Sequence, residues 1–161
     1  MSKSKLNPTN NSLPPKARAE VIALLNTALA DLSDLYSQAK QAHWNVRGKR
    51  FFMLHELFDK TAETVGAHID EVAERVTQLG GYAQGTVRMA ASASRLKEWP
   101  DDLLNQDEFL ATLAKRVAAV ANSIRAAIDV AAKAGDADTA DLFTEISRDL
   151  DKALWMLEAS E

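Results

Sequence analysis

The strongest constraint on the fold is a helical apolar repeat that returns in four long segments. In residues 17–46 the spacing of three and four residues that marks one face of a helix is carried by Val21, Leu24, Leu25, Ala28, Leu32 and Leu35. The same spacing recurs in residues 51–79, in residues 107–134, and from the acidic stretch 136–141 onward. Gly48, the pair Gly80-Gly81, and Gly135 follow the first three segments, as expected at helix ends. No segment alternates like a β-strand, so the sequence predicts an all-α fold.

The segments between and before these helices complete the predicted architecture. Residues 82–106 form a long connection, with a short helix expected around Ala91 to Lys97, before Pro100. Four helices with one long crossover between the second and the third form a ferritin-like four-helix bundle. Residues 1–15 contain three prolines and no apolar repeat, which predicts a mobile N-terminal arm. Residues 16–161 are then one bundle domain.

Composition excludes several classes of protein. The chain has no cysteine, which excludes a disulfide scaffold, a thiolate zinc site and a cysteine nucleophile. No apolar run approaches the roughly 20 residues of a membrane span, and no apolar stretch follows the first lysines as in a secretory signal, so we expect a cytoplasmic protein. The net charge of −4 disfavours nucleic-acid binding over the whole surface, because such binding needs a basic face.

The second predicted helix has two distinct faces. One apolar stripe suits packing against the helices of the same chain. A second stripe, about 100° away around the axis, consists of His55, Asp59, Ala62, Gly66, Asp70 and Ala73, with Glu74 at its edge. Small residues in the middle of this stripe let two helices approach closely. We therefore expect this face to pack against another helix, with metal ligands at its two ends.

The ligands on this stripe form two pairs, His55 with Asp59 and Asp70 with Glu74, each at a spacing of i,i+4 that allows one ion to be shared. Either pair alone is more often ordinary surface chemistry. The two pairs are about 22 Å apart along one helix, so a single copy cannot join them. Two antiparallel copies can, because one register sets His55 opposite Glu74 and Asp59 opposite Asp70, creating two equivalent sites per dimer.

His43 adds a further nitrogen if the turn through Gly48 folds the end of the first helix alongside the second. Two imidazoles and three carboxylates suit Fe(II), Mn(II) or Zn(II), and iron fits a site with room for an oxidant. His68 lies on the opposite side of the second helix, so we expect an ordinary surface or interface histidine there.

Several short motifs follow one another in a fixed order. They are QAHWNVRG at 41–48, then Phe52, Leu54-His55, Phe58-Asp59, His68-Ile69-Asp70, Ala73-Glu74-Arg75 and Leu79-Gly80-Gly81. In this order they resemble the Dps family, ferritin-like mini-ferritins also called DNA-binding proteins from starved cells. The resemblance runs from about Ala19 to the C-terminus, where it includes Thr139-Ala140-Asp141 and the run 147–152.

The resemblance implies a hollow dodecameric shell with a ferroxidase centre of two irons at each dimer interface. All five ligand positions of the family match: one subunit provides His43, His55 and Asp59, and its mate provides Asp70 and Glu74. The implied activity is oxidation of Fe(II), preferably by hydrogen peroxide rather than oxygen, with storage of a ferric mineral; zinc or manganese are the expected substitutes. Trp44 resembles a family tryptophan near the centre, either an electron donor or a packing aromatic.

An acidic stripe begins the fourth helix, formed by Asp138, Asp141, Glu145 and Asp149. In shells of the Dps family this region lines three-fold pores that attract Fe(II). The alternative is a charge cluster favoured by the helix dipole, with a solvated face beyond it. Asp149 is also close enough in sequence to pair with Arg148 or Lys152.

The main alternative function is DNA binding and condensation, which would place the protein on the nucleoid. Lys3, Lys5, Lys16 and Arg18 precede the first acid, Glu20, so the arm is locally basic. Repeated on a shell, weak contacts of this kind could add up to useful affinity. The competing explanation is a solubilising tail. A third alternative, a bundle that no longer oxidises iron, conflicts with five matched ligands.

Overall fold

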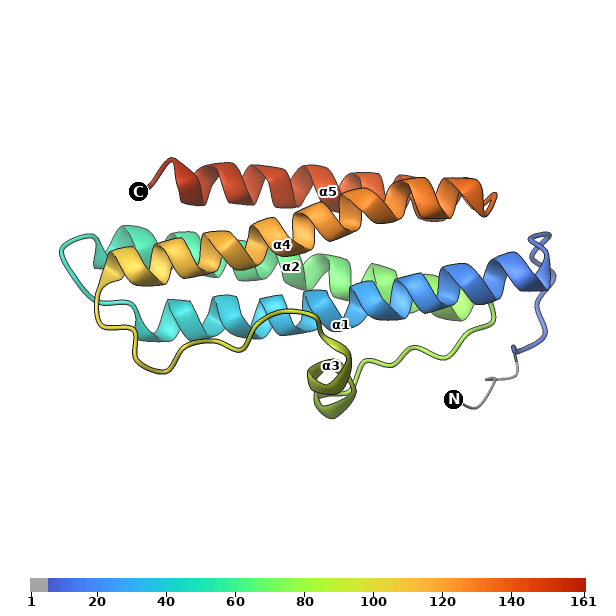
Figure 1. The fold of residues 1–161 in the computed structure, drawn as a ribbon, viewed down its shortest axis with the longest axis horizontal. Coiled ribbons are helices and arrows are strands. Elements are labelled where there is room, and N and C mark those ends of the chain that lie inside the picture. The colour runs from blue at the N-terminus through green and yellow to red at the C-terminus, as the bar shows by residue number, and fades with distance from the viewer. Residues whose placement is uncertain (1–5) are drawn as a thin grey trace.

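The computed structural model describes residues 6–161 and confirms the all-α fold, with helices and no strand in that range. The helices are α1 (Pro15–Asn45), α2 (Phe51–Gln78), α3 (Val87–Ala93), α4 (Gln106–Lys133) and α5 (Ala137–Glu158). The four long helices lie side by side as a bundle (Figure 1), with α1 packed along α2 and α4 along α5. Helix α3 lies in the crossover, beside α1.

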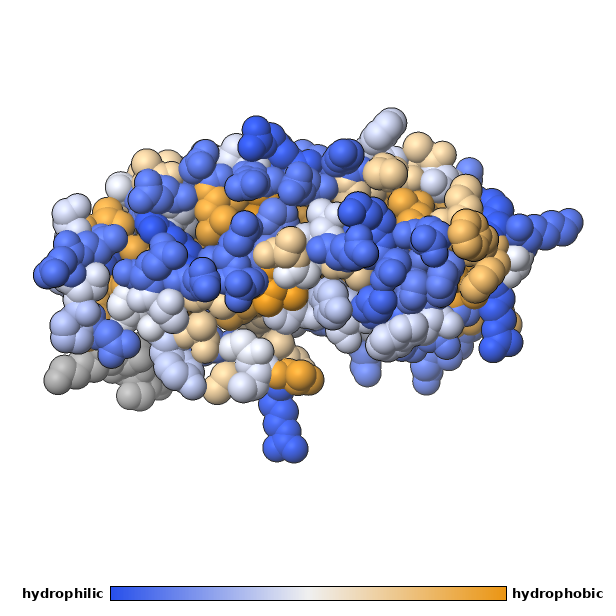
Figure 2. All heavy atoms as spheres, turned by 180° about the vertical axis from the view of Figure 1, so that it is seen from behind, coloured by the Kyte–Doolittle hydropathy of each residue, from blue (hydrophilic) through white to orange (hydrophobic). Residues whose placement is uncertain are grey.

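One continuous core runs between the four long helices. Its largest fully buried side chains include Phe58 of α2, Phe143 of α5, and leucines of α1, α2 and α4. These are the positions of the apolar repeat, so the pattern that predicts the helices also explains their packing. On the face seen in Figure 2, polar side chains dominate and hydrophobic patches are scattered. Within residues 6–161, no helix is both long enough and apolar enough to span a membrane.

Side-chain caps fix where the later helices begin. Asn105 accepts hydrogen bonds from the backbone N–H groups of Asp107 and Glu108, and the Glu108 carboxylate accepts from Asn105 N, forming a capping box. The short crossover helix begins earlier than the predicted range 91–97, because the Thr86 side chain accepts a hydrogen bond from Met89 N and so caps α3.

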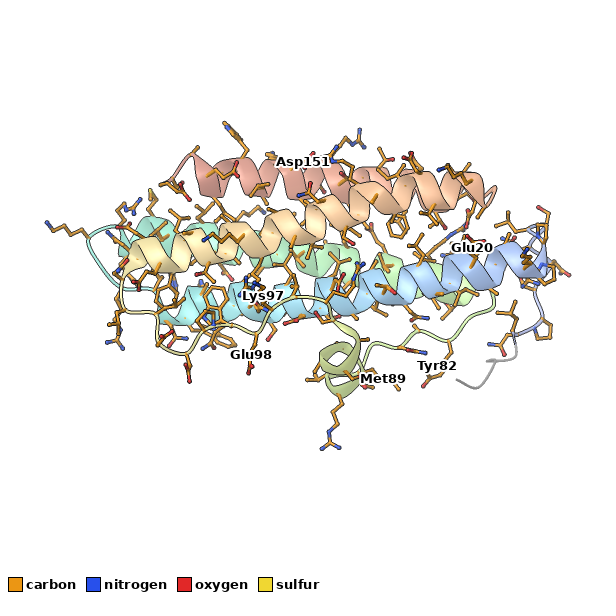
Figure 3. The ribbon with its side chains drawn as sticks, viewed as in Figure 1. Glu20, Tyr82, Met89, Lys97, Glu98 and Asp151 are labelled. Carbon is orange, nitrogen blue, oxygen red and sulfur yellow. The ribbon has the colours of Figure 1, made fainter. Side chains whose placement is uncertain are left out.

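The crossover is held against α1 by buried polar contacts. The Asp31 carboxylate is buried and accepts hydrogen bonds from Arg95 N at 2.8 Å and Arg95 Nε at 3.0 Å. Further along, the buried Gln38 donates to the carbonyl of Lys97 at 3.0 Å. Figure 3 shows Lys97 and Glu98 where the crossover runs along α1. These bonds place the crossover beside the end of α1 that carries His43.

A second polar cluster joins the end of α2 to the start of α5. Asp136 caps α5 by accepting from Thr139 N and Thr139 Oγ1. Arg75 of α2 donates from Nη2 to Asp136 Oδ1 at 2.8 Å and from Nε to Thr139 Oγ1 at 3.0 Å. Because Asp136 is only 2% exposed, this carboxylate depends on those donors for its stability.

Candidate metal centre

Two of the predicted ligands come together where α1 ends and α2 begins. The chain turns between these helices at Gly48, whose φ of +135° is a backbone conformation that favours glycine. This turn stacks the His43 and His55 rings, with centroids 3.7 Å apart and an interplanar angle of 23°. The Phe51 ring lies 5.1 Å from the His55 ring. The expectation that His43 lies alongside the second helix is therefore confirmed.

Hydrogen bonds to the backbone orient both imidazoles. His43 Nδ1 lies 2.8 Å from the carbonyl oxygen of His55, and His55 Nδ1 lies 2.9 Å from the carbonyl oxygen of His43. A carbonyl oxygen only accepts, so each Nδ1 carries the hydrogen and donates it. Each Nε2 then keeps its lone pair, the arrangement in which a neutral histidine binds a metal ion.

Asp59 lies one turn beyond His55 and is paired with a lysine. Lys40 Nζ lies 2.6 Å from Asp59 Oδ1. The hydrogen bond from Lys40 lowers the pKa of Asp59, and partial burial opposes this effect. Lys40 also lies over the exposed Trp44 ring, 5.9 Å from its centroid. A metal ion bound by Asp59 would therefore have to compete with the Lys40 ammonium.

The other two predicted ligands lie far from this end of the bundle. Asp70 and Glu74 are exposed on α2, about 22 Å and about 28 Å along the helix from His55. Across residues 6–161, no three His, Cys, Asp or Glu side chains approach closely enough to hold one metal ion. One copy therefore brings His43 and His55 together with Asp59 nearby, and the pairing with a second copy stays a prediction.

The middle of the ligand stripe differs from our expectation. Ala62 is buried within its own chain, with 1% of its surface exposed. A Cβ built on Gly66 would lie 3.2 Å from the Tyr36 ring of α1, so this glycine makes room for a side chain of the same copy. Ala62 and Gly66 thus allow α1 to pack closely against α2 in the same chain. A contact with a helix of another copy stays a prediction.

His68, predicted to be an ordinary surface or interface histidine, does not lie on the surface. His68 is buried at 4% exposure, with Nδ1 2.9 Å from Glu71 Oε2 and Nε2 3.0 Å from Asp149 Oδ2. It connects α2 to α5 and is not a surface histidine. Asp149 is therefore bonded to His68. The sequence had instead indicated a pair with its neighbour Arg148 or Lys152. The bond to His68 holds the Asp149 side chain against α2.

The remaining acids of the stripe lie on the surface of α5. Asp138, Asp141 and Glu145 are exposed, and Asp138 lies 3.6 Å from Arg75. Exposure is compatible with a pore lining and with a solvated face, so the pore role stays a prediction.

The basic residues near the N-terminus are not equivalent. Lys16 is exposed, whereas Arg18 is buried and donates from Nη1 to the carbonyl of Leu79. The role of these residues in DNA binding stays a prediction. Lys3 and Lys5 lie outside the described residues.

Lys40 and the residues of an adjacent groove are the features that sequence analysis missed. A groove of about 820 Å³ runs between α1 and the crossover, and its apolar lining includes Tyr36, Trp44, Ile69, Leu96 and Trp99. Lys40 also lines it. The spacing of three residues between Lys40 and His43 was a usable signal, because it places both side chains on one helix face.

Replacing Lys40 with methionine should tighten Fe(II) binding by about two- to fivefold, the size expected for removing a partly exposed ion pair that competes with the metal. Methionine keeps most of the side-chain volume and removes the charge. Anaerobic equilibrium titration with Fe(II) measures the change. Lys60→Met is the matched control, because Lys60 pairs with Glu63 on the same helix as Asp59. Unchanged or weaker binding in Lys40→Met would contradict competition at Asp59.

Comparison with known proteins agrees with this fold. The ferritin-like domain model matches residues 22–160, so the chain is a ferritin-like protein. It is 47% identical over 155 residues to the DNA protection during starvation protein of Agrobacterium fabrum, covering 96% of each chain. It is 33% identical over 147 residues to the protein of that name from Streptococcus suis, covering 91% of this chain and 86% of the relative. The chain belongs to the Dps family, the DNA protection during starvation proteins.

Solved structures agree with this assignment. DpsC from Streptomyces coelicolor superposes with a TM-score of 0.92 at 30% identity, covering 97% of this chain and 91% of that chain. The Dps protein from Vibrio cholerae, described as a member of a broad superfamily of ferritin-like diiron-carboxylate proteins, superposes with a TM-score of 0.87 at 26% identity, covering 98% of both chains.

Proposed function

We propose that this chain oxidises Fe(II) at sites shared between two copies, with hydrogen peroxide as the preferred oxidant, and stores the ferric product inside a dodecameric shell. The observation that carries the proposal is the stacked pair of His43 and His55, whose Nδ1 atoms are held by the backbone so that both Nε2 atoms can bind a cation. Membership of a family that includes a described diiron-carboxylate relative supports iron as the substrate.

In the proposed reaction the substrate is a pair of Fe(II) ions. Each iron loses one electron, and the two electrons with two protons reduce one hydrogen peroxide molecule to two water molecules. The protein holds the ions with positions open to the oxidant. His43, His55 and Asp59 of one copy provide half of the ligands, and Asp70 and Glu74 of a second copy provide the rest. Consuming iron and peroxide together would limit oxidative damage.

Several surface features support assembly with a second copy. Asp70 and Glu74 are exposed on the same helix as His55, as a shared site requires. The groove beside Trp44 and Tyr36 presents aromatic side chains on the α1 side of the bundle, where another copy could cover them. Trp44 would then lie between subunits close to the centre, and in this position it could donate an electron to stray oxidant. Asp141 and Glu145, exposed on α5, would attract Fe(II) toward a pore of the shell.

Mixing two inactive variants tests the shared site. His55→Ala and Glu74→Ala chains are refolded together in equal amounts, and Fe(II) oxidation by peroxide is followed by ferric absorbance. Half of the dimers are mixed, and one of their two sites has every ligand, so activity should recover to about one quarter of wild type. The matched control mixes His55→Ala with Asp59→Ala, whose damaged ligands lie in the same half, and it should recover nothing.

Each outcome has a distinct meaning. A wild-type rate equal to that of Fe(II) and peroxide in buffer would refute the ferroxidase proposal. An active wild type without recovery in the first mixture would instead place the complete site within one chain.

A further inference from the structure

The turn that sets His43 against His55 is bonded to a third element of the bundle. This turn consists of residues 46–50, between α1 and α2. Gln106, the first residue of α4, accepts a hydrogen bond through Oε1 from Arg50 N at 2.9 Å. The turn, the start of α4 and the C-terminus lie at the same end of the bundle (Figure 1). Helix α4 carries none of the proposed ligands, so it can influence the site only through contacts of this kind.

Gly48 allows the Gln106 side chain to lie directly against the turn. A Cβ at Gly48 would lie 2.5 Å from Gln106 Oε1 and 2.8 Å from Gln106 Cδ, which is too close for a side chain to fit. The oxygen that packs on Gly48 is also the one that accepts the hydrogen bond from Arg50 N. One side chain of α4 therefore contacts the middle of the turn and the residue just before α2.

The Arg50 side chain adds two further connections at this end. Its guanidinium pairs with Asp107 of α4 and donates to the carbonyl of Ser160, near the C-terminus. The Arg50 carbonyl accepts from Leu54 N at 3.0 Å, as the first bond of α2. Arg50 and Gln106 are both half-buried, and hydrogen bonds partly shielded from water are stronger than exposed ones. The start of α2 is thus held by α4 and by the end of the chain.

The position of the turn determines how both imidazoles are oriented. His43 Nδ1 donates to the carbonyl of His55, and His55 Nδ1 donates to the carbonyl of His43. Each ring is therefore aimed by the backbone of the other helix. A shift of the start of α2 relative to the end of α1 would move both acceptors and turn both Nε2 atoms. Groups that orient metal ligands contribute strongly to metal affinity.

We propose that Gln106 is a positioning residue for the metal centre. By accepting the Arg50 N–H and packing on Gly48, it holds the turn in the path that aims His43 and His55 at one cation. Gln106 acts through the backbone and does not bind the ion. This inference rests on the proposed function, in which the cation is the Fe(II) substrate.

Two substitutions at Gln106 separate the effect of its oxygen from that of its volume. Gln106→Met keeps most of the side-chain volume and loses the acceptor, whereas Gln106→Glu keeps an oxygen that can accept the Arg50 N–H. Anaerobic titration with Co(II) alone, followed by the visible absorbance of the bound ion, measures metal affinity. His43→Ala identifies the absorbance that belongs to this site. Gln106→Met should bind Co(II) about tenfold more weakly than wild type, and Gln106→Glu within about twofold of wild type.

Asn105→Ala is the matched control at the same end of α4. The Asn105 side chain accepts from the backbone N–H groups of Asp107 and Glu108, so its loss weakens the start of the helix and leaves the bond between Arg50 and Gln106 in place. This variant should bind Co(II) like wild type. Hydrogen exchange over residues 46–54 of the metal-free protein reports the turn directly. Exchange there should be faster in Gln106→Met than in wild type or Gln106→Glu.

The outcomes separate the positioning role from the proposed function. Equal Co(II) affinity in Gln106→Met and wild type would overturn the positioning role. An equal loss of affinity in Gln106→Met and in Gln106→Glu or Asn105→Ala would overturn it as well, because the accepted hydrogen bond would then not be the cause. A wild type that binds no Co(II) at the histidine pair would also overturn it. The expected Co(II) pattern in a protein that fails to oxidise Fe(II) would support the positioning role and refute the ferroxidase proposal alone.

Discussion

Replacing His43 with alanine should slow peroxide-dependent Fe(II) oxidation at least about 10- to 100-fold, because even partners that only orient a metal ligand contribute that much. The substitution removes a proposed ligand and also the stacking partner of His55. The initial rate of ferric absorbance, measured at limiting Fe(II), gives the result. We expect the loss to appear at every Fe(II) concentration, since the ions would no longer be held as a pair.

The control for His43 is Asn45→Ala on the same last turn of α1. Asn45 is exposed and donates to the carbonyl of Gln41, so its loss alters the helix end without touching a candidate ligand. Both variants should give the wild-type circular dichroism spectrum and particle size. A His43→Ala protein that keeps the wild-type rate as a folded particle would remove this residue from the site.

Replacing Asp136 with alanine should lower the free energy of unfolding by about 3–5 kcal/mol, the effect of breaking a buried ion pair by removing one partner. The variant loses the cap of α5 and leaves the Arg75 guanidinium, itself largely buried, without its closest carboxylate. Urea denaturation followed by circular dichroism measures the change. Protein concentration must be matched between samples, because association stabilises the folded state.

Asp138→Ala is the matched comparison, because Asp138 also faces Arg75. Its side chain is 83% exposed and lies 3.6 Å from Arg75 Nη2, so its loss should change stability by less than about 1 kcal/mol. Equal losses of unfolding free energy in Asp136→Ala and Asp138→Ala would show that burial does not determine how much a carboxylate paired with Arg75 contributes to stability.

Local sequence patterns predict most of the fold. The apolar repeat places all four long helices, because their buried faces recur at the helical period. Gly48 and Gly135 mark helix ends through positive φ, and Asn105 precedes the start of α4 and caps it. Helix α3 is short and has one buried residue, Ala90, so its apolar pattern is too weak to predict its start. The cap at Thr86 decides it instead.

The candidate site is predicted only in part, because some of its contacts join residues distant in sequence. The stacking of His43 on His55 follows from the turn at Gly48 and the spacing of the helices. The Lys40 pair with Asp59, the Asp149 bond to His68 and the burial of Arg18 depend on how separate elements pack. No local sequence pattern predicts these pairings. Each pairing changes whether a charged side chain is free to bind a metal ion or another molecule.

His43 and His55 each donate a side-chain hydrogen bond to the backbone carbonyl of the other, and this affects how substitutions at the site act. The carbonyl of His43 is in the last turn of α1, where backbone oxygens have no partner within the helix. His55 Nδ1 donates to that carbonyl, so the His55 side chain acts as a C-terminal cap of α1. Substituting His55 therefore frays a helix end as well as removing a nitrogen, whereas Asp70 and Glu74, exposed on α2, play no such part. Variants on the two sides of one proposed site will differ in stability for reasons unrelated to metal.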